Sequence, residues 1–355
     1  MTNRQFALIA SCLLLCGCPS TRQPDDATLD ALTTGPCSLE RSATVVVISN
    51  VDGGNDLIGD VAAANVTLVK RLLSGDVDGD GTRDFEPLER VRVLVALNMP
   101  RVPDGPGDVG CNGVGSGAVW TSIALDRFCP ESPRVGQVVF DVRPGDSFQE
   151  DLRCFLETRD LDGSCTPETF DTALAALSPA DGPVELAPLM GLGDGVNSAY
   201  RERQDVLVLL MHQSNRRDDC SRRLHDVPSS VGLCTEEGDE PYCCEANLPP
   251  VTRTSEALRE ILRGRPVVYA AYAAAPAFDP TAEPAARLDE IVADGIDARC
   301  VYVAPHPRTV RLARALYPDM HLLPLVCRGP SMGGVAPPID VTEVARGAFD
   351  RLCAP

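Results

Sequence analysis

Continuous runs of aliphatic and β-branched residues recur along the chain, and stretches with apolar residues at helical spacing lie between them. The runs are TVVVIS (44–49), VRVLVALN (91–98), DVLVLLM (205–211), VVYAAYAA (267–274) and RCVYVA (299–304). Helical spacing is found in 57–74, 148–157, 167–177, 254–263, 284–293, 307–316 and 341–352. This alternation predicts an α/β fold, with a mostly parallel central sheet covered by helices on both faces.

Two stretches without clear periodicity interrupt the alternation. Residues 99–147 are rich in Gly and Pro and contain one segment, VVFDV (138–142), that can form a short strand. Residues 212–252 carry several cysteines and little periodicity. We therefore expect one α/β domain over residues 44–353, with disulfide-stapled loop insertions at about 99–147 and 212–252.

The beginning of the chain has the layout of an export signal. Its apolar run, from Phe6 to Leu15, is too short to span a bilayer as a helix. The run ends in Leu-Cys-Gly-Cys, and small residues directly before a cysteine resemble the bacterial lipoprotein signal. We expect a signal peptide over 1–17, a lipid on Cys18 such as palmitate, and a tether over 18–43. The chain would then be exported and anchored in the bacterial cell envelope, at the outer membrane; an ordinary secretory signal is the alternative.

The chain has 15 cysteines, which agrees with export. Removing Cys12 and Cys16 with the signal and assigning Cys18 to lipid leaves an even set, which indicates structural disulfides. Short-range pairings such as Cys111 with Cys129 and Cys154 with Cys165 fit the spacing, but the sequence leaves the connectivity open. Zinc is a weaker interpretation, because the chain has no CxxC pair. The disulfide candidates are Cys37, Cys111, Cys129, Cys154, Cys165, Cys220, Cys234, Cys243, Cys244, Cys300, Cys327 and Cys353.

The charge balance limits the partners that the chain can bind. Hydrophobic residues make up 44% and charged residues 23%, and the formal net charge is −19. A phosphate-binding surface needs a concentrated positive field, so we do not expect nucleic acid as a partner. We expect cations, the membrane through the lipid anchor, and a protein or another ligand of the cell envelope.

Five segments carry a family resemblance through their order along the chain. They are SNVDGGND (49–56), GDVDGDGTRDFEPLERVRVLVALNM (75–99), DLRCFLETRDLDGSCTPETFDTALAAL (151–177), RQDVLVLLMHQSNRRDDCS (203–221) and APPIDVTEVARGAFDRLC (336–353). They resemble the von Willebrand factor type A domain found in bacterial exported, cysteine-rich lipoproteins. The resemblance covers residues 40–353. It implies a Rossmann-like α/β domain whose loop after the first strand holds a divalent cation.

The adhesion-site metal loop of that family is degenerate in this chain. The family's Asp-x-Ser-x-Ser pattern presents alternating oxygens to a hard cation, but the matching positions here are Ser49, Val51 and Gly53. Where the family has an acidic loop after a later strand, this chain has His212-Gln213-Ser214-Asn215. The residues left in the degenerate loop are Ser49, Asn50, Asp52 and Asn215. We therefore expect that the scaffold is kept and the metal of this site is lost.

A second acidic motif, DVDGDGTRD (76–84), lies between the first helix and the second strand. An EF-hand-like calcium loop takes carboxylates from positions 1, 3 and 5, a glycine at 6, a backbone carbonyl at 7 and a ligand at 9. Asp76, Asp78, Asp80, Gly81, Thr82 and Asp84 fill these places in register, whereas Pro87 stands where a bidentate glutamate is usual. We expect a structural calcium site, since contiguous ligands would surround the ion; a solvated acidic turn is the alternative.

Enzyme motifs are weak. The glycine-rich segments GVGSG (113–117) and GLGDG (191–195) lack the Lys-Ser/Thr of a phosphate loop. The leading hypothesis is a non-catalytic, membrane-tethered binding, adhesion or scaffold protein. One alternative is an active divalent-metal-dependent adhesion domain. The other is a cell-envelope hydrolase that uses His212 and a nearby nucleophile such as Ser214.

Overall fold

The computed structural model describes part of the chain. The described residues are 41–49, 58–97, 120–157, 168–179, 205–212, 219, 221, 233–234, 242–243, 250–274, 307–325 and 338–352. The chain divides into two units, Met1–Pro36 and Cys37–Pro355, and every described residue belongs to the second. The predicted signal peptide and Cys18 therefore lie outside the described residues.

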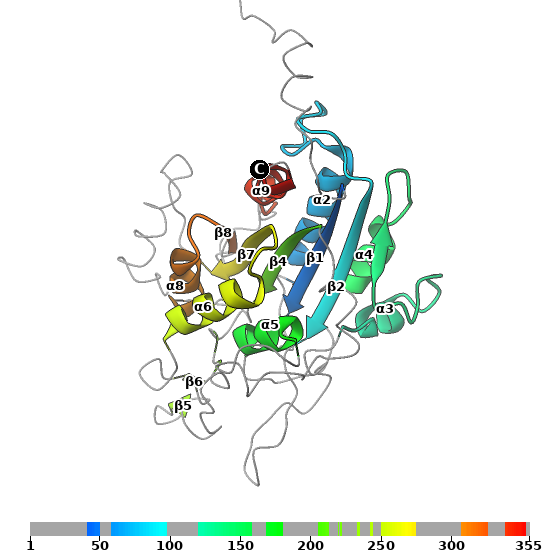
Figure 1. Cartoon of the computed structure of the whole chain (residues 1–355). Coiled ribbons are helices and arrows are strands. Elements are labelled where there is room, and N and C mark those ends of the chain that lie inside the picture. Colours follow the sequence, from blue (N-terminus) through cyan, green and yellow to red (C-terminus); the bar gives the residue numbers. More distant parts are fainter. Residues whose placement is uncertain are drawn as a thin grey trace, which may run out of the picture. The chain divides into compact units, whose positions relative to one another are not determined.

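Strands and helices alternate along the second unit (Figure 1). The strands are β1 (Ser42–Ser49), β2 (Arg90–Leu97), β3 (Phe140–Val142), β4 (Val206–His212), β5 (Leu233–Cys234), β6 (Tyr242–Cys243), β7 (Val267–Ala274) and β8 (Met320–Leu325). The helices are α2 (Ile58–Ser74), α3 (Ile123–Phe128), α4 (Gln149–Leu156), α5 (Thr169–Leu177), α6 (Val251–Ile261), α8 (Pro307–Ala315) and α9 (Thr342–Leu352).

A six-stranded sheet in the order β3-β2-β1-β4-β7-β8 forms the centre of this unit. All neighbouring strands run parallel except β3, which pairs antiparallel with β2. The chain builds the sheet outward from β1 on one side and then from β4 on the other, as in doubly wound α/β folds. The predicted α/β fold with a mostly parallel sheet is therefore confirmed.

Helices cover both faces of the sheet, which explains the unbroken apolar strands. Successive side chains of a strand point to opposite faces. Val45 and Val47 of β1 lie in a core with α2, α4 and α9, whereas Val46 and Ile48 lie in a core with α5, α6 and α8. Every residue of β1 is buried. A strand enclosed on both faces has no solvent side, and so needs no polar alternation.

The predicted elements agree with the structure in most places. The predicted strands 44–49, 91–98, 205–211 and 267–274 correspond to β1, β2, β4 and β7, and VVFDV contains β3. The sequence analysis missed α3, β8 and the two-residue strands β5 and β6. The predicted helix 284–293 and strand 299–304 lie outside the described residues.

One disulfide is defined in the described part of the chain. It joins Cys129, at the end of α3, to Cys154 of α4, with Cα atoms 6.0 Å apart. Since each sulfur forms one such bond, this pairing excludes both short-range pairings, Cys111 with Cys129 and Cys154 with Cys165. Those pairings were inferred from nearness in sequence, whereas α3 and α4 are nearest in space.

Candidate functional site

The carboxyl ends of β1 and β4 mark the point where the strand order reverses. In open α/β sheets, ligands bind in the crevice beyond this point. The sheet register places Ser49, the last residue of β1, beside His212, the last residue of β4, and His212 beside Tyr272 of β7. The structure therefore brings two residues of the predicted site, Ser49 and His212, into one row across the sheet.

This row forms a buried polar layer beneath α2. Ser49 Oγ lies 3.4 Å from His212 Nδ1, a long hydrogen bond. The His212 ring meets Tyr272 edge-on at a centroid distance of 6.0 Å, and the Tyr272 hydroxyl donates to Asn65 Oδ1 of α2. Burial raises the pKa of Tyr272, so this phenol stays protonated and remains a donor. Contacts inside the protein thus engage the Ser49 hydroxyl, His212 Nδ1 and the Tyr272 hydroxyl.

The polar layer offers little to a hard cation. Ser49 is 4% exposed and His212 is 1% exposed, and an imidazole is a poorer ligand for Mg²⁺ than a carboxylate. Asn50, Asp52 and Asn215 lie outside the described residues. Within the part of the chain that the structure describes, the carboxylates gathered closely enough for a metal ion lie elsewhere.

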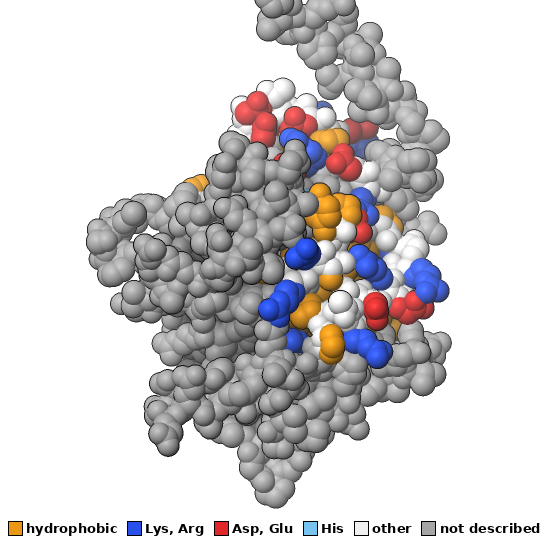
Figure 2. All heavy atoms as spheres, turned by 90° about the vertical axis from the view of Figure 1, so that its left-hand side faces the viewer, with side chains coloured by type: hydrophobic (Ala, Val, Ile, Leu, Met, Phe, Trp, Pro, Cys, Tyr) orange, Lys and Arg blue, Asp and Glu red, His pale blue; other side chains and the backbone are white. Residues whose placement is uncertain are grey.

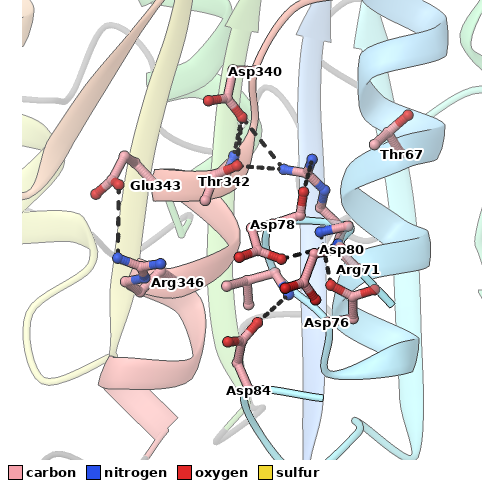
Figure 3. A network of polar contacts seen from close by, with 12 residues as sticks. Thr67, Arg71, Asp76, Asp78, Asp80, Asp84, Asp340, Thr342, Glu343 and Arg346 are labelled. Atoms are coloured by element: carbon pink, nitrogen blue, oxygen red, sulfur yellow. Dashed lines mark hydrogen bonds and ion pairs between the residues drawn. The ribbon is translucent and has the colours of Figure 1, made fainter. Parts of the chain in front are cut away.

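Those carboxylates belong to the acidic loop Asp76–Asp84, between α2 and β2. Asp76, Asp78 and Asp84 each place one oxygen within 4.8 Å of the other two (Figure 3). Three carboxylate oxygens at this spacing fit a hard divalent cation such as Ca²⁺. Asp80 is not one of the three, and its Oδ1 accepts a 2.6 Å hydrogen bond from the Thr82 N–H. Of the four aspartates that the sequence motif contains, three therefore lie together in the structure.

Backbone geometry gives the acidic loop its tight curvature. The Asp76 carboxylate accepts hydrogen bonds from the N–H groups of Gly79 at 2.7 Å and Gly81 at 3.0 Å. Gly81, the glycine at the sixth position of the motif, has φ +92°, a conformation that other residues rarely adopt. Val77, inside the loop, is fully buried in the core beneath α2. The loop is thus a folded part of the domain.

A second buried polar cluster lies at the start of α5, and the sequence analysis missed its role. The Asp219 carboxylate accepts from the Phe170 N–H and Ser221 N–H, both at 2.9 Å, and from Ser221 Oγ at 2.8 Å. Ser221 Oγ in turn accepts from the Asp171 N–H. Burial raises the pKa of Asp219 to about 7, although Arg308 and these donors act in the opposite direction. Aspartate and serine are both common at helix N-caps, and here they accept from N–H groups of a helix distant in sequence.

A third buried polar cluster lies near the amino ends of the parallel strands. Asp205, directly before β4, is fully buried and pairs with Arg92 of β2 at 3.2 Å and with Arg265 at 2.6 Å. Thr44 Oγ1 of β1 donates to the same carboxylate at 2.5 Å. Removing the Asp205 carboxylate would take the buried counter-charge away from both arginines. We assign this cluster to stability, since each member contacts another part of the protein.

Charge is unevenly distributed over the described surface. Figure 2 shows basic side chains spread over the described part of the face that carries α6 and α8, with one group of acidic side chains near the top and another beside the basic ones lower down. Some of these arginines make local contacts: Arg263 pairs with Glu260, and Arg259 donates to the Ala315 carbonyl. The exposed arginines of the two helices are Arg253, Arg259, Arg311 and Arg314, and Arg263 follows shortly after α6.

Comparison with known proteins adds no relative from which a function could be transferred. No protein-family model matches the chain, and no curated protein matches it significantly. None of the helices within the described ranges is both long and apolar enough to cross a membrane. The two candidate sites of the described residues are the polar layer and the acidic loop.

Proposed function

We propose that the protein is a non-catalytic, lipid-anchored binding or scaffold protein of the bacterial cell envelope, built on a type A-like domain that has lost its adhesion metal. The observation that carries the proposal is the polar layer at the strand-order reversal. There Ser49 and His212 contact each other in a buried setting, where an adhesion site needs carboxylate and hydroxyl oxygens open to a cation. The sheet order supports the same scaffold.

The loss of the adhesion metal can be tested with Mn²⁺. The full chain carrying Asp76→Asn and Asp78→Asn, which weaken the acidic loop, is titrated by calorimetry and compared with the same chain carrying Ser49→Ala in addition. We expect no tight Mn²⁺ binding in either. Tight binding that disappears only with Ser49→Ala would establish an active adhesion site and contradict the proposal.

We also propose that the acidic loop binds calcium and that the ion is structural. Its support is the gathering of Asp76, Asp78 and Asp84 around one position, together with the register of the sequence motif. The loop lies between α2 and β2, and the strand-order reversal lies at the opposite end of β1. The ion would therefore hold a connection in place and take no direct part in ligand binding.

Calcium that binds only the folded chain must raise its stability. At a concentration 100-fold above the Kd, the gain is about 2.7 kcal/mol. We expect the Tm of the full chain to rise with millimolar Ca²⁺ and to fall back after chelation. The Asp76→Asn/Asp78→Asn chain is the control and should show no rise. An equal rise in both chains would remove the loop as the binding site.

The lipid anchor is tested by expressing the full chain in bacteria fed an alkyne-tagged fatty acid. We expect label on the wild-type chain and none on a Cys18→Ser chain. Label that persists in the Cys18→Ser chain would place the modification elsewhere. Absence of label from both would favour an ordinary secretory signal, the alternative drawn from the sequence.

Hydrolysis is a second candidate function, because Ser49 and His212 form a serine–histidine contact. A catalytic serine must be reachable by substrate, and Ser49 is 4% exposed. A fluorophosphonate probe, which labels activated serines, decides between the candidates. We expect no labelling of the full chain. Labelling that Ser49→Ala abolishes would instead establish a hydrolase.

A further inference from the structure

The C-terminal helix α9 is packed onto the same face of the sheet as α2. Its buried side chains are Val344, Ala345, Ala348, Phe349 and Leu352. Gly347 allows a close approach, because a Cβ at this position would lie 3.2 Å from His321 Nε2 and 3.5 Å from a methyl of Val268. The helix thus covers part of the apolar surface of β7 and β4.

Arg71, in the last turn of α2, connects this helix to the acidic loop. Its Nη2 donates to the Asp78 carbonyl at 3.1 Å. Its Nη1 donates to Thr342 Oγ1 at 2.8 Å and lies 3.4 Å from Asp340 Oδ1. The Arg71 side chain is 16% exposed, so the guanidinium is largely enclosed between the loop and the first turn of α9 (Figure 3).

Asp340 completes this connection at the start of α9. Its Oδ1 accepts from the Thr342 N–H at 2.9 Å and from Thr342 Oγ1 at 2.5 Å. Partial burial acts in the opposite direction, but the hydrogen bonds from Thr342 and the Arg71 guanidinium lower the pKa of Asp340. The carboxylate is therefore charged at neutral pH, and it both caps the helix and pairs with Arg71.

The other end of the loop contacts α9 through aromatic rings. Phe85, directly after Asp84, stacks on Phe349 with ring centroids 4.7 Å apart and the planes 1° from parallel. The Phe85 N–H donates to the Gly75 carbonyl at 2.9 Å, and this bond holds together the two residues that flank the loop. The start of α9 is thus contacted by Arg71 of α2, which the Asp78 carbonyl of the loop also binds, and Phe349, near the other end of α9, is contacted by Phe85, directly after the loop.

We propose that the acidic loop is a clasp for α9, and that Arg71 and Phe85 are the residues through which it holds the helix. When the loop keeps its folded shape, the Asp78 carbonyl holds the Arg71 guanidinium against the start of α9, and the Phe85 ring packs on Phe349. When the loop opens, both contacts are lost together and α9 is released first from the sheet. The clasp itself rests on these contacts; its control by calcium rests on the calcium site proposed above.

Hydrogen exchange followed by mass spectrometry tests the clasp on the full chain. In Arg71→Met, which keeps the aliphatic stem but removes the guanidinium, we expect amides of 342–352 to exchange at least tenfold faster, and those of β1 and β4 to be unchanged. Phe85→Ala should do the same. Arg346→Met is the matched control: this exposed arginine lies on α9 and pairs only weakly, at 4.0 Å, with Glu343. It should leave α9 exchange as in the wild type.

Unchanged α9 exchange in both Arg71→Met and Phe85→Ala would overturn the clasp. If Arg71→Met fails to fold, Arg71→Lys carries the same test, because lysine keeps the charge but lacks the planar fork that contacts two partners. Calcium separates the two proposals. If Ca²⁺ slows exchange in the loop but not in α9 of the wild type, the calcium site stands and the clasp fails. If Ca²⁺ changes nothing while Arg71→Met frees α9, the clasp stands and the calcium site fails.

Discussion

Gly75 shows how much of the acidic loop depends on one residue. Its φ is +75°, and a Cβ at this position would lie 2.0 Å from the Phe85 carbonyl oxygen, a backbone atom that cannot move aside cheaply. Its own carbonyl accepts from the N–H groups of Asp84 and Phe85, both at 2.9 Å. A side chain here would break the closure of the loop as well as strain the backbone.

Gly75→Ala is therefore expected to lower the free energy of unfolding by more than about 2 kcal/mol, since the left-handed conformation alone costs an alanine about 1–2 kcal/mol. Urea unfolding measures the loss. Gly264→Ala is the matched control, because Gly264 has φ +78° but open space around its Cβ position. Equal losses in the two variants would show that the contact with Phe85 contributes nothing.

Asp219 predicts a pH dependence with a definite sign. Burial raises the pKa of Asp219 from 3.8 to about 7, so between these values the folded chain keeps a proton that the unfolded chain has lost. This group therefore lowers stability as the pH rises from about 4 to about 7, with no further change above. The stability of the wild type minus that of Asp219→Asn, measured by urea unfolding at several pH values, should fall through this window. A difference that stays constant or rises would contradict the assignment.

At the scale of elements, the sequence predicted what depends on local pattern. β1, β2, β4 and β7 were found because strands buried on both faces are continuously apolar. β8 was missed because Pro324 interrupts its pattern, and the position of β8 at the end of the sheet in the described residues tolerates a proline. α3 was missed because it is short and lies within a stretch rich in Gly and Pro.

In the candidate sites too, the sequence predicted the features that depend on local spacing and missed the contacts between distant residues. The spacing of the aspartates is local, so the sequence predicted that Asp76, Asp78 and Asp84 would gather. The same motif includes Asp80, whose carboxylate lies outside this group, because a motif gives positions along the chain and does not give side-chain rotamers. Arg71 contacts Asp340, 269 positions away, and no periodicity in one sequence could reveal that pair. The pairing of Ser49 with His212 followed only once β1 and β4 were known to be neighbours.

The buried ion pairs of Asp205, at the amino ends of the strands, allow a test of how much they stabilise the sheet. Asp205 connects β4 to Arg92 of β2 and to Arg265 before β7. Asp205→Ala removes the buried carboxylate that both arginines contact, so we expect a loss of about 3–5 kcal/mol in the free energy of unfolding. The control is Asp141→Ala, which removes a pair with Arg90 between β3 and β2 that is about one-third exposed; about 0–1 kcal/mol is expected there. A small loss in the Asp205 variant would mean that water replaces the missing carboxylate.

At the scale of the whole molecule, the net charge of −19 opposes compaction. The Debye length falls from about 30 Å at 0.01 M salt to about 8 Å at 0.15 M. We therefore expect the Tm to rise over this range in buffer that contains a chelator, which keeps divalent cations from contributing. Choline chloride should act like sodium chloride, since the effect is screening. A Tm that falls with salt would show that attractive surface pairs outweigh the repulsion.

Arg71 and its partners Asp340 and Thr342 are far apart in the sequence, so during export they would leave the membrane at different times. A chain exported as proposed emerges from the membrane with its N-terminus first, so α2 and the acidic loop arrive outside well before Asp340 and Thr342. Until those residues arrive, the sheet surface that α9 covers stays open to envelope chaperones and proteases. A product truncated before Asp340 would leave the part of the β7 and β4 surface that α9 covers open to solvent.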